Sequence, residues 1–239
     1  MAFRTSSKQA GKKVVALIGV GPLVGEDIAK VFAASPDHTL ALMSRSLDSL
    51  RSLATKLGNG TQAFHCDVTQ PETVHRAFQE LRAAQGEPDV VLYNVRDWHF
   101  GSFADVSAQD FEDCWKFATL GLFHVCKEVT PAMLQRRSGV IGVTGATANW
   151  RGMPQTAAFA PAKAAQRSLA QSLARDLGPK GIHVYLVVVD GVIGEGGGAM
   201  VSPSAIANTH LMLANQPAGA WTFELNLTAS GGCDKLVTI

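Results

Sequence analysis

The chain has 239 residues and a formal net charge of +1, with 46% hydrophobic and 17% charged residues. This length suits one α/β domain, and it allows a complete core to be buried without disulfides or metals. The near-neutral charge argues against broad electrostatic attraction to nucleic acid or to an anionic membrane, so we expect neither as a partner. The sequence also contains no run of about 18 apolar residues that would span a membrane.

Cysteine and histidine usage favours a reducing compartment and no metal site. The cysteines form no CxxC pair; we expect Cys66, Cys114 and Cys126 to be buried, and Cys233 to be more exposed in a Gly-rich tail. The histidines show no HExxH-type spacing. Residues 1–12 contain basic side chains but no apolar stretch typical of a secretory signal. We therefore expect a flexible arm over 1–12, one domain over 13–239 and a cytoplasmic location.

Strand-like and helix-like segments alternate along the chain. Short apolar runs predict buried parallel strands at 14–18, 40–43, 63–68, 90–93, 140–143, 182–189 and 221–227. Apolar residues at helical spacing predict helices at 24–34, 47–57, 71–85, 107–136, 156–177 and 203–213, with Ser107 as the N-cap of the fourth. The alternation predicts a single doubly wound Rossmann-type α/β domain, with about seven strands in a mostly parallel sheet and helices on both faces.

A glycine-rich turn connects the first predicted strand to the first predicted helix. Gly19, Gly21 and Gly25 allow a tight turn and a close approach of the backbone to a pyrophosphate, with Leu23 and Val24 in the same turn. The helix that follows supplies unpaired N–H groups and the positive end of its dipole. Glycines occur in turns of every kind, but a position between a strand and a helix indicates a dinucleotide site.

Polar residues follow the next three strands. Ser44 and Arg45 end the second strand, where a carboxylate would favour NAD. Arg45 can instead pair with a 2′-phosphate, which favours NADP(H) over NAD(H). The alternative is that Arg45 is a solvated surface charge. Asp67, followed by Val68, can accept a hydrogen bond from an adenine amino group, cap the next helix, or do both. Asn94 ends the fourth strand, at the edge where such folds bind ligands.

Taken together, these residues resemble the short-chain dehydrogenase/reductase family over nearly the whole chain. Gly19 and Gly25 match the outer glycines of the family's TGxxxGxG turn, and Leu23 stands at the middle one. Asp67-Val68 matches an acidic-Val pair, and Asn94 matches one Asn of the family's NNAG. The most specific likeness is Phe159-Ala-Pro-Ala-Lys163, which aligns with the family's YxxxK.

The resemblance implies a set of catalytic positions, most of which are changed here. In the family a Tyr exchanges a proton with the substrate oxygen, a Lys lowers the Tyr pKa and binds the nicotinamide ribose, a Ser holds the substrate oxygen, and an Asn completes a proton relay. The matching residues are Phe159, Lys163, Ala146 and Ala118, so only Lys163 is kept. Thr147, beside Ala146, is the second candidate catalytic residue. Losing a general acid costs roughly 10²–10⁴ in rate, so ordinary carbonyl reduction should be slow while nucleotide binding persists.

Three hypotheses therefore stay open. The first is an NADP(H)-dependent oxidoreductase for an unknown carbonyl or alcohol substrate, with a displaced acid or base. Candidates for that group are Thr144, Thr147, Lys163, Asp190 and His99. The second is a catalytically silent nucleotide-binding or scaffold protein. The third is a structural subunit that has lost even the nucleotide.

The resemblance also implies details at the edges of the site. Asp190-Gly191 stands where the family has Pro-Gly after the sixth strand, beside the expected nucleotide, and Arg96 replaces a glycine near the expected nicotinamide position. A homodimer or homotetramer is implied as well, formed through the long helices that begin near Ser107 and Thr156.

Overall fold

The computed structural model describes residues 11–96, 99–196, 198 and 200–231. Its central element is a seven-stranded sheet in the order β3-β2-β1-β4-β5-β6-β9, and all six neighbouring pairs are parallel. The predicted Rossmann-type fold is thus confirmed. The strands are β1 (Lys13–Ile18), β2 (His38–Ser44), β3 (Gln62–His65), β4 (Val90–Tyr93), β5 (Gly139–Ala146), β6 (Ile182–Asp190) and β9 (Glu224–Thr228).

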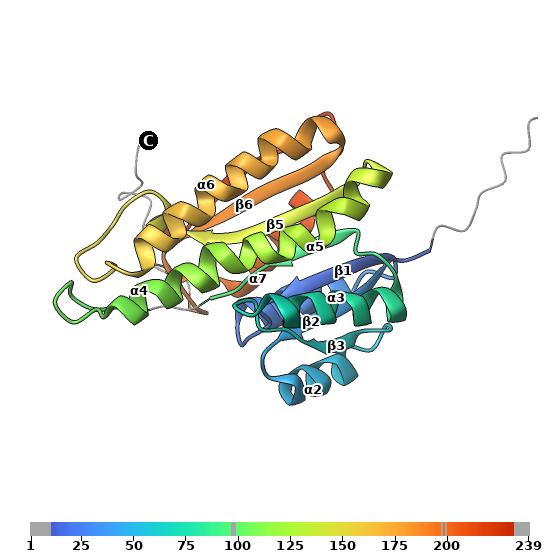
Figure 1. Ribbon diagram of the computed structural model, residues 1–239, viewed down its shortest axis with the longest axis horizontal. Helices are drawn as coiled ribbons and strands as arrows, with labels where there is room; N and C mark the ends of the chain where they lie inside the picture. The colour runs from blue at the N-terminus through green and yellow to red at the C-terminus, as the bar shows by residue number, and fades with distance from the viewer. Residues whose placement is uncertain (1–10, 97–98, 197, 199, 232–239) are drawn as a thin grey trace, which may run out of the picture.

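Helices cover both faces of this sheet (Figure 1). They are α1 (Val24–Ala33), α2 (Leu47–Leu57), α3 (Pro71–Gln85), α4 (Ala108–Trp115), α5 (Gly121–Arg136), α6 (Phe159–Leu177) and α7 (Pro203–Ala214). Side chains of α3, α5 and α6 pack on one face, and those of α1, α2 and α7 pack on the other. Successive residues of β1 alternate between the two cores, so that Ala16 and Ile18 join the first and Val15 and Leu17 the second.

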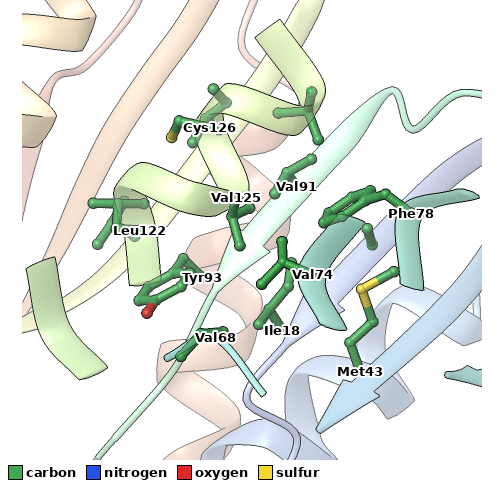
Figure 2. Close-up of a cluster of buried hydrophobic side chains, with 14 of the residues drawn as sticks. Ile18, Met43, Val68, Val74, Phe78, Val91, Tyr93, Leu122, Val125 and Cys126 are labelled. Atoms are coloured by element: carbon green, nitrogen blue, oxygen red, sulfur yellow. The ribbon is translucent and has the colours of Figure 1, made fainter. Parts of the chain in front are cut away.

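The core between α3, α5 and the sheet supports the edge where the site lies. Figure 2 shows Val74 and Phe78 of α3 and Val125 of α5 meeting side chains of the strands, among them Tyr93 at the end of β4. The whole group is buried. Truncating one of its large side chains would cost about 2–5 kcal/mol of unfolding free energy, because a cavity would remain.

The sheet register explains why site residues from distant parts of the chain meet. Ile18 at the end of β1 pairs with Met43 of β2 and with Tyr93 of β4. The residues that follow, Gly19 after β1 and Asn94 after β4, therefore lie together at the carboxyl edge of the sheet. This is the edge at which doubly wound folds bind ligands.

The predicted helix over 107–136 is interrupted. Ser107 caps α4 through a capping box with Asp110, as predicted, but a π-helical turn (Lys116–Leu120) separates α4 from α5. Two side chains bind carbonyls of this turn: the Tyr93 hydroxyl donates to the Phe117 carbonyl, and the Gln166 amide donates to the Ala118 carbonyl. A π turn is a rare insertion inside an α-helical pattern, so helical periodicity alone could not predict this one. Such turns are frequent at functional sites.

Other predicted boundaries also differ. The third strand ends at His65 rather than at residue 68, since the Asp67 carboxylate closes a local turn with Thr69. The helix predicted over 156–177 begins later than expected. α6 starts at Phe159, because the Thr156 hydroxyl bonds the backbone of Met153 instead of entering the helix. A small pair of strands, β7 (Val192–Ile193) and β8 (Met200–Val201), was not predicted, since two residues carry no periodicity.

The expected burial of Cys66, Cys114 and Cys126 is confirmed. Cys233 and residues 1–10 of the predicted arm lie outside the described residues. Within the described part of the chain, none of the helices combines the length and hydropathy needed to cross a membrane.

Candidate functional site

A cleft of about 1020 Å³ opens at the carboxyl edge of the sheet. Every residue predicted to bind a dinucleotide lines this cleft, and so do Ala146, Thr147 and Phe159. Ala118 does not line it, because it is buried in the π-helical turn. The fold thus gathers residues from all three thirds of the sequence around one cavity, whose size suits a small-molecule ligand.

Gly19 holds the glycine turn against the end of β4. Its φ angle is 85°, and a Cβ atom there would lie 2.6 Å from the Val95 nitrogen and 2.7 Å from the Asn94 carbonyl carbon. The Asn94 amide donates to the Gly19 carbonyl at 3.0 Å. Asn94 therefore has a structural contact in addition to its predicted place beside a ligand, because it fixes the turn to the sheet.

The rest of the turn leaves room for a phosphate group. A Cβ atom on Gly21 would meet nothing within 4 Å, whereas one on Gly25 would lie 3.0 Å from the Val20 Cα atom. Helix α1 begins at Val24, and its N-cap residue Leu23 has no polar side chain to occupy the first N–H groups. An open cradle at a helix N-terminus fits the pyrophosphate of a dinucleotide.

Leu23 occupies a backbone conformation that favours glycine. Its φ and ψ angles are 65° and −107°, and its side chain is exposed and lies outside the core. A branched residue in this region stores strain of about 1–3 kcal/mol. The turn therefore keeps the glycine-type geometry despite the loss of the glycine.

At the end of the cleft next to β2, Ser44 and Arg45 follow that strand and line the cleft with Asp67 and Val68. The Arg45 guanidinium carbon lies 5.0 Å from the centre of the Phe117 ring, at a distance typical of a cation–π contact. The interpretation of Asp67 as a helix cap is wrong. The N-cap of α3 is Gln70. The Asp67 carboxylate accepts from the Thr69 backbone and hydroxyl at 3.0 and 2.8 Å instead of bonding the first turn of the helix.

Lys163 extends from α6 to the cleft and is buried. Its Nζ atom donates to Gln166 Oε1 at 3.0 Å and, at 3.5 Å, to the Thr144 carbonyl. The Phe159 ring centre lies 5.8 Å from the same atom. Burial lowers the pKa of Lys163 from 10.5 to about 8, because desolvation disfavours the ammonium form. Such a pKa suits a group that exchanges protons near neutral pH.

The aromatic and small residues beside Lys163 supply no hydroxyl. The Phe159 ring packs against Phe100, with ring centres 5.5 Å apart, and Ala146 ends β5. With its amide nitrogen turned toward them, Asn149 donates to the carbonyls of Ala146 and Lys163 at 3.1 and 3.2 Å. This part of the cleft is therefore an apolar wall with one ammonium group at its base.

Asp190 and Gly191 stand at the end of β6 on the same side. Asp190 accepts from Arg151 at 3.5 Å and from the Thr228 hydroxyl at 3.3 Å, so its carboxylate is engaged by neighbouring strands and loops. Thr147 begins a 3₁₀ turn after β5. His99 does not line the cleft, and its Nδ1 atom lies 3.4 Å from an Asp110 oxygen. It is thus the weakest of the acid or base candidates.

Sequence reasoning missed two polar contacts around Thr144 and Lys163. Fully buried His210 on α7 bonds the Thr144 hydroxyl at 3.1 Å and the Tyr185 hydroxyl at 3.2 Å, and burial lowers its pKa to about 3. A lone His in an apolar helix gives no sequence indication of these partners. Gln166 was detectable in principle, since it follows Lys163 by three residues and so shares its helix face.

Comparisons with known proteins agree with this fold. The family model described as short chain dehydrogenase matches residues 13–195. Oxidoreductase UcpA of Salmonella typhimurium is 30% identical over 179 residues, which cover 73% of this chain and 67% of that protein. A short-chain dehydrogenase from Rhodopseudomonas palustris has a TM-score of 0.80 and 32% identity, with 90% of this chain and 97% of that chain covered.

A metagenomic short-chain oxidoreductase solved in complex with NADP has a TM-score of 0.80 at 20% identity, with 92% of this chain and 99% of that chain covered. This last likeness concerns the fold alone. The family match covers most of the sheet, including the glycine turn, Lys163 and the ends of β5 and β6. The chain belongs to the short-chain dehydrogenase/reductase family of oxidoreductases.

Proposed function

We propose that the chain binds NADP(H) in this cleft and interconverts a carbonyl and an alcohol, with Lys163 in place of the missing tyrosine as the proton donor and acceptor. The observation that carries the proposal is the buried Lys163 ammonium at the base of a cleft whose other end has a glycine cradle and Arg45. The substrate itself is proposed only as a carbonyl or alcohol compound.

Dinucleotide binding is supported by the fit of the residues present. Gly21 leaves open space beside the first turn of α1, where backbone N–H groups can bind a pyrophosphate. Asp67 is available at the adenine side, and Lys163 and Gly191 lie at the opposite end of the cleft. These groups are spread along the cavity as the two halves of a dinucleotide would require.

The preference for NADP(H) over NAD(H) depends on Arg45. A guanidinium can bond a phosphate through two N–H groups, whereas a ribose hydroxyl offers it little. The contact with Phe117 supports this role, because it restrains a long side chain on the cleft wall. The solved metagenomic relative named above holds NADP, which makes this cofactor the natural probe.

The proton step would involve the chain's own Lys163. When bound, a reduced nicotinamide dinucleotide supplies a hydride to the carbonyl carbon. Lys163 donates a proton to the carbonyl oxygen as negative charge develops there, which forms the O–H bond of the alcohol and leaves a neutral amine. A pKa of about 8 keeps Lys163 mostly protonated at neutral pH, so the group is charged when the step begins. Two of its three N–H groups have protein acceptors, and the third can serve the substrate.

Calorimetric titration with NADPH and NADH tests the binding part. We expect saturable 1:1 binding of NADPH, at least tenfold tighter than that of NADH. Arg45→Ala should weaken NADPH binding by about tenfold to a hundredfold and leave NADH binding unchanged, because a charge-assisted contact is worth about 1.5–3 kcal/mol. Arg175→Ala on α6, outside the cleft, is the matched control.

A screen of carbonyl compounds, followed through cofactor absorbance, tests the proton step. Turnover should be slow, should exceed the rate without protein, and should disappear in Lys163→Ala. It should also change with pH near 8, because protonated Lys163 drives reduction and its neutral form drives oxidation. Turnover that survives in Lys163→Ala would assign the proton to another group.

A second candidate function is a catalytically silent nucleotide-binding scaffold. It is favoured by the apolar wall of Phe159, Phe100 and Ala146, where substrate oxygen would need hydrogen-bond donors. This candidate predicts tight NADPH binding with no turnover of any compound, at any pH. The two functions are therefore separated by the same pair of measurements.

We also propose a homodimer or homotetramer formed through α4, α5 and α6. Phe111, Trp115 and Phe123 are exposed on α4 and α5, and exposed aromatic side chains gathered on helices are typical of interfaces. Light scattering on the purified chain tests this; a monomer at micromolar concentration would contradict it.

A further inference from the structure

Gln166 is a fully buried amide that connects Lys163 to the π-helical turn. Its relative exposure is 0%. Its Oε1 atom accepts from Lys163 Nζ at 3.0 Å, and its Nε2 atom donates to the Ala118 carbonyl at 2.9 Å. A buried amide with both ends bonded cannot turn without losing both contacts, so it is rigid on chemical grounds.

The two partners together determine which way the amide points. A backbone carbonyl only accepts hydrogen bonds, so Ala118 requires the Nε2 end. An ammonium only donates, so Lys163 requires the Oε1 end. Exchanging oxygen and nitrogen would bring two acceptors together at one end and two donors at the other. The assignment therefore follows from the neighbours and needs no further assumption.

The π-helical turn supplies the anchor of this chain of contacts. The turn is tied to α6 by a second bond, from the Thr119 hydroxyl to the Ala162 carbonyl at 2.9 Å. On its other side, the Phe117 carbonyl accepts from the Tyr93 hydroxyl at the end of β4. The Ala118 carbonyl is thus held between the sheet and α6, and it holds Gln166 in turn.

We propose that Gln166 is the positioning residue of Lys163: its amide, oriented by the Ala118 carbonyl, fixes the direction of the Lys163 ammonium at the base of the cleft. This inference deepens the proposed function, on which its catalytic meaning depends. The lysine side chain has four rotatable bonds and would otherwise adopt several conformations. A fixed acceptor leaves one N–H group directed toward a ligand.

The charged state of Lys163 should respond to Gln166 because an acceptor stabilises the ammonium against the desolvation that lowers its pKa. Cys114 on α4 raises the pKa of Lys163, against the larger lowering by burial. The Arg151–Asp190 ion pair lines the same cleft. Removing the Gln166 acceptor while these groups stay in place should lower the pKa of Lys163 further. A carboxylate at position 166 should raise it.

The test is a titration of Lys163 Nζ by NMR on the full chain labelled with ¹⁵N-lysine, without any dinucleotide. The Lys163 signal is assigned by its absence in Lys163→Arg. We expect Gln166→Leu to lower the midpoint by about one pH unit and Gln166→Glu to raise it by about one unit. Gln171→Leu, on the same helix and outside the cleft, should leave it unchanged. Equal midpoints in wild type, Gln166→Leu and Gln166→Glu would overturn the proposal.

Circular dichroism and NADPH calorimetry separate the positioning role of Gln166 from misfolding and from the proposed function. If Gln166→Leu fails to fold by circular dichroism, the Gln166→Glu variant still decides the question, because it keeps an acceptor for the Lys163 ammonium while it adds a negative charge and removes the Nε2 donor to the Ala118 carbonyl. NADPH affinity, measured separately by calorimetry, should fall severalfold in Gln166→Leu and recover in Gln166→Glu. Absence of NADPH binding with shifted midpoints would reject the proposed function and keep the positioning role, whereas normal binding with unshifted midpoints would do the reverse.

Discussion

The two ends of the cleft have changed in different ways relative to the family pattern. At the end formed by the glycine turn, the geometry persists: Gly19 and Leu23 both have positive φ angles, and α1 begins where a phosphate would be bound. At the end formed by α6, the chemistry has changed: Phe159 and Ala146 offer no hydroxyl beside Lys163. One end has Leu23 where the resemblance implies a glycine and keeps a glycine-type turn, whereas the other has Phe159 where the resemblance implies the acid.

The difference follows from what each end requires. A pyrophosphate is bound mainly by backbone N–H groups, and several sequences can supply that backbone. Proton transfer instead needs one titratable atom at one place, so a single substitution removes it. Nucleotide binding alone would therefore say little about catalysis, and in the proposed function activity depends on the buried Lys163.

The largest effect should come from restoring hydroxyl groups at the changed end. Phe159→Tyr combined with Ala146→Ser should raise the rate of carbonyl reduction by about 10²-fold or more, because a positioned general acid typically contributes that much. The measurement is single-turnover oxidation of bound NADPH in the presence of a carbonyl compound. Each single variant serves as a control, and an unchanged rate in the double variant would mean that the wall around Phe159 no longer accommodates a substrate.

Alanine substitutions in the glycine turn should lower the unfolding free energy strongly at Gly19 and hardly at all at Gly21. Gly19→Ala should destabilise the fold by about 3 kcal/mol or more, since its Cβ atom would overlap the backbone of β4's end at a positive φ angle. Gly21→Ala should leave the unfolding free energy nearly unchanged and weaken NADPH binding, because its Cβ atom would enter the open cradle. Urea unfolding and calorimetry measure the two effects. Equal stability losses in both variants would contradict the geometry of the turn.

Replacing Lys163 by an apolar residue should stabilise the fold at neutral pH. The pKa of Lys163 is lowered from 10.5 to about 8 in the fold, so the unfolded chain binds more protons between these values, and stability rises with pH across that window. The unfolding free energy of Lys163→Met at pH 7 should therefore exceed that of the wild type by about 1–2 kcal/mol, after allowing for the lost contact with Gln166. The advantage should vanish toward pH 10.5 in urea unfolding at several pH values. A gain independent of pH would contradict the lowered pKa.

The smallest effect should come from Leu23. Leu23→Gly should raise the unfolding free energy by about 1 kcal/mol, because relief of strain exceeds the added flexibility of the unfolded chain. Leu23→Ala keeps the strained φ angle and should bring no gain. Thermal unfolding of the two variants beside wild type measures the difference, and a destabilised Leu23→Gly would show that the leucine side chain makes a compensating contact.

The parts of this molecule that repeat a simple pattern were predictable from sequence. Apolar runs and helical spacing gave the strands and most helices, and strand ends gave residues such as Arg45 and Asn94 that do meet in one cleft. The π-helical turn was not predictable, because it arises from Tyr93 and Gln166, which lie 24 and 48 residues from their acceptors. The same holds for His210 and Thr144, which only the packing of α7 on β5 brings together.

The most direct test of the account compares the two ends in one experiment: the NADPH dissociation constant of the wild-type chain and of Phe159→Tyr with Ala146→Ser, measured by calorimetry under identical conditions. If nucleotide binding belongs to the glycine-turn end, both proteins should bind NADPH saturably at 1:1, with constants that agree within about threefold, while only the double variant gains fast turnover. A wild-type chain that binds no NADPH, with binding restored by the two substitutions, would contradict the separation of the two ends.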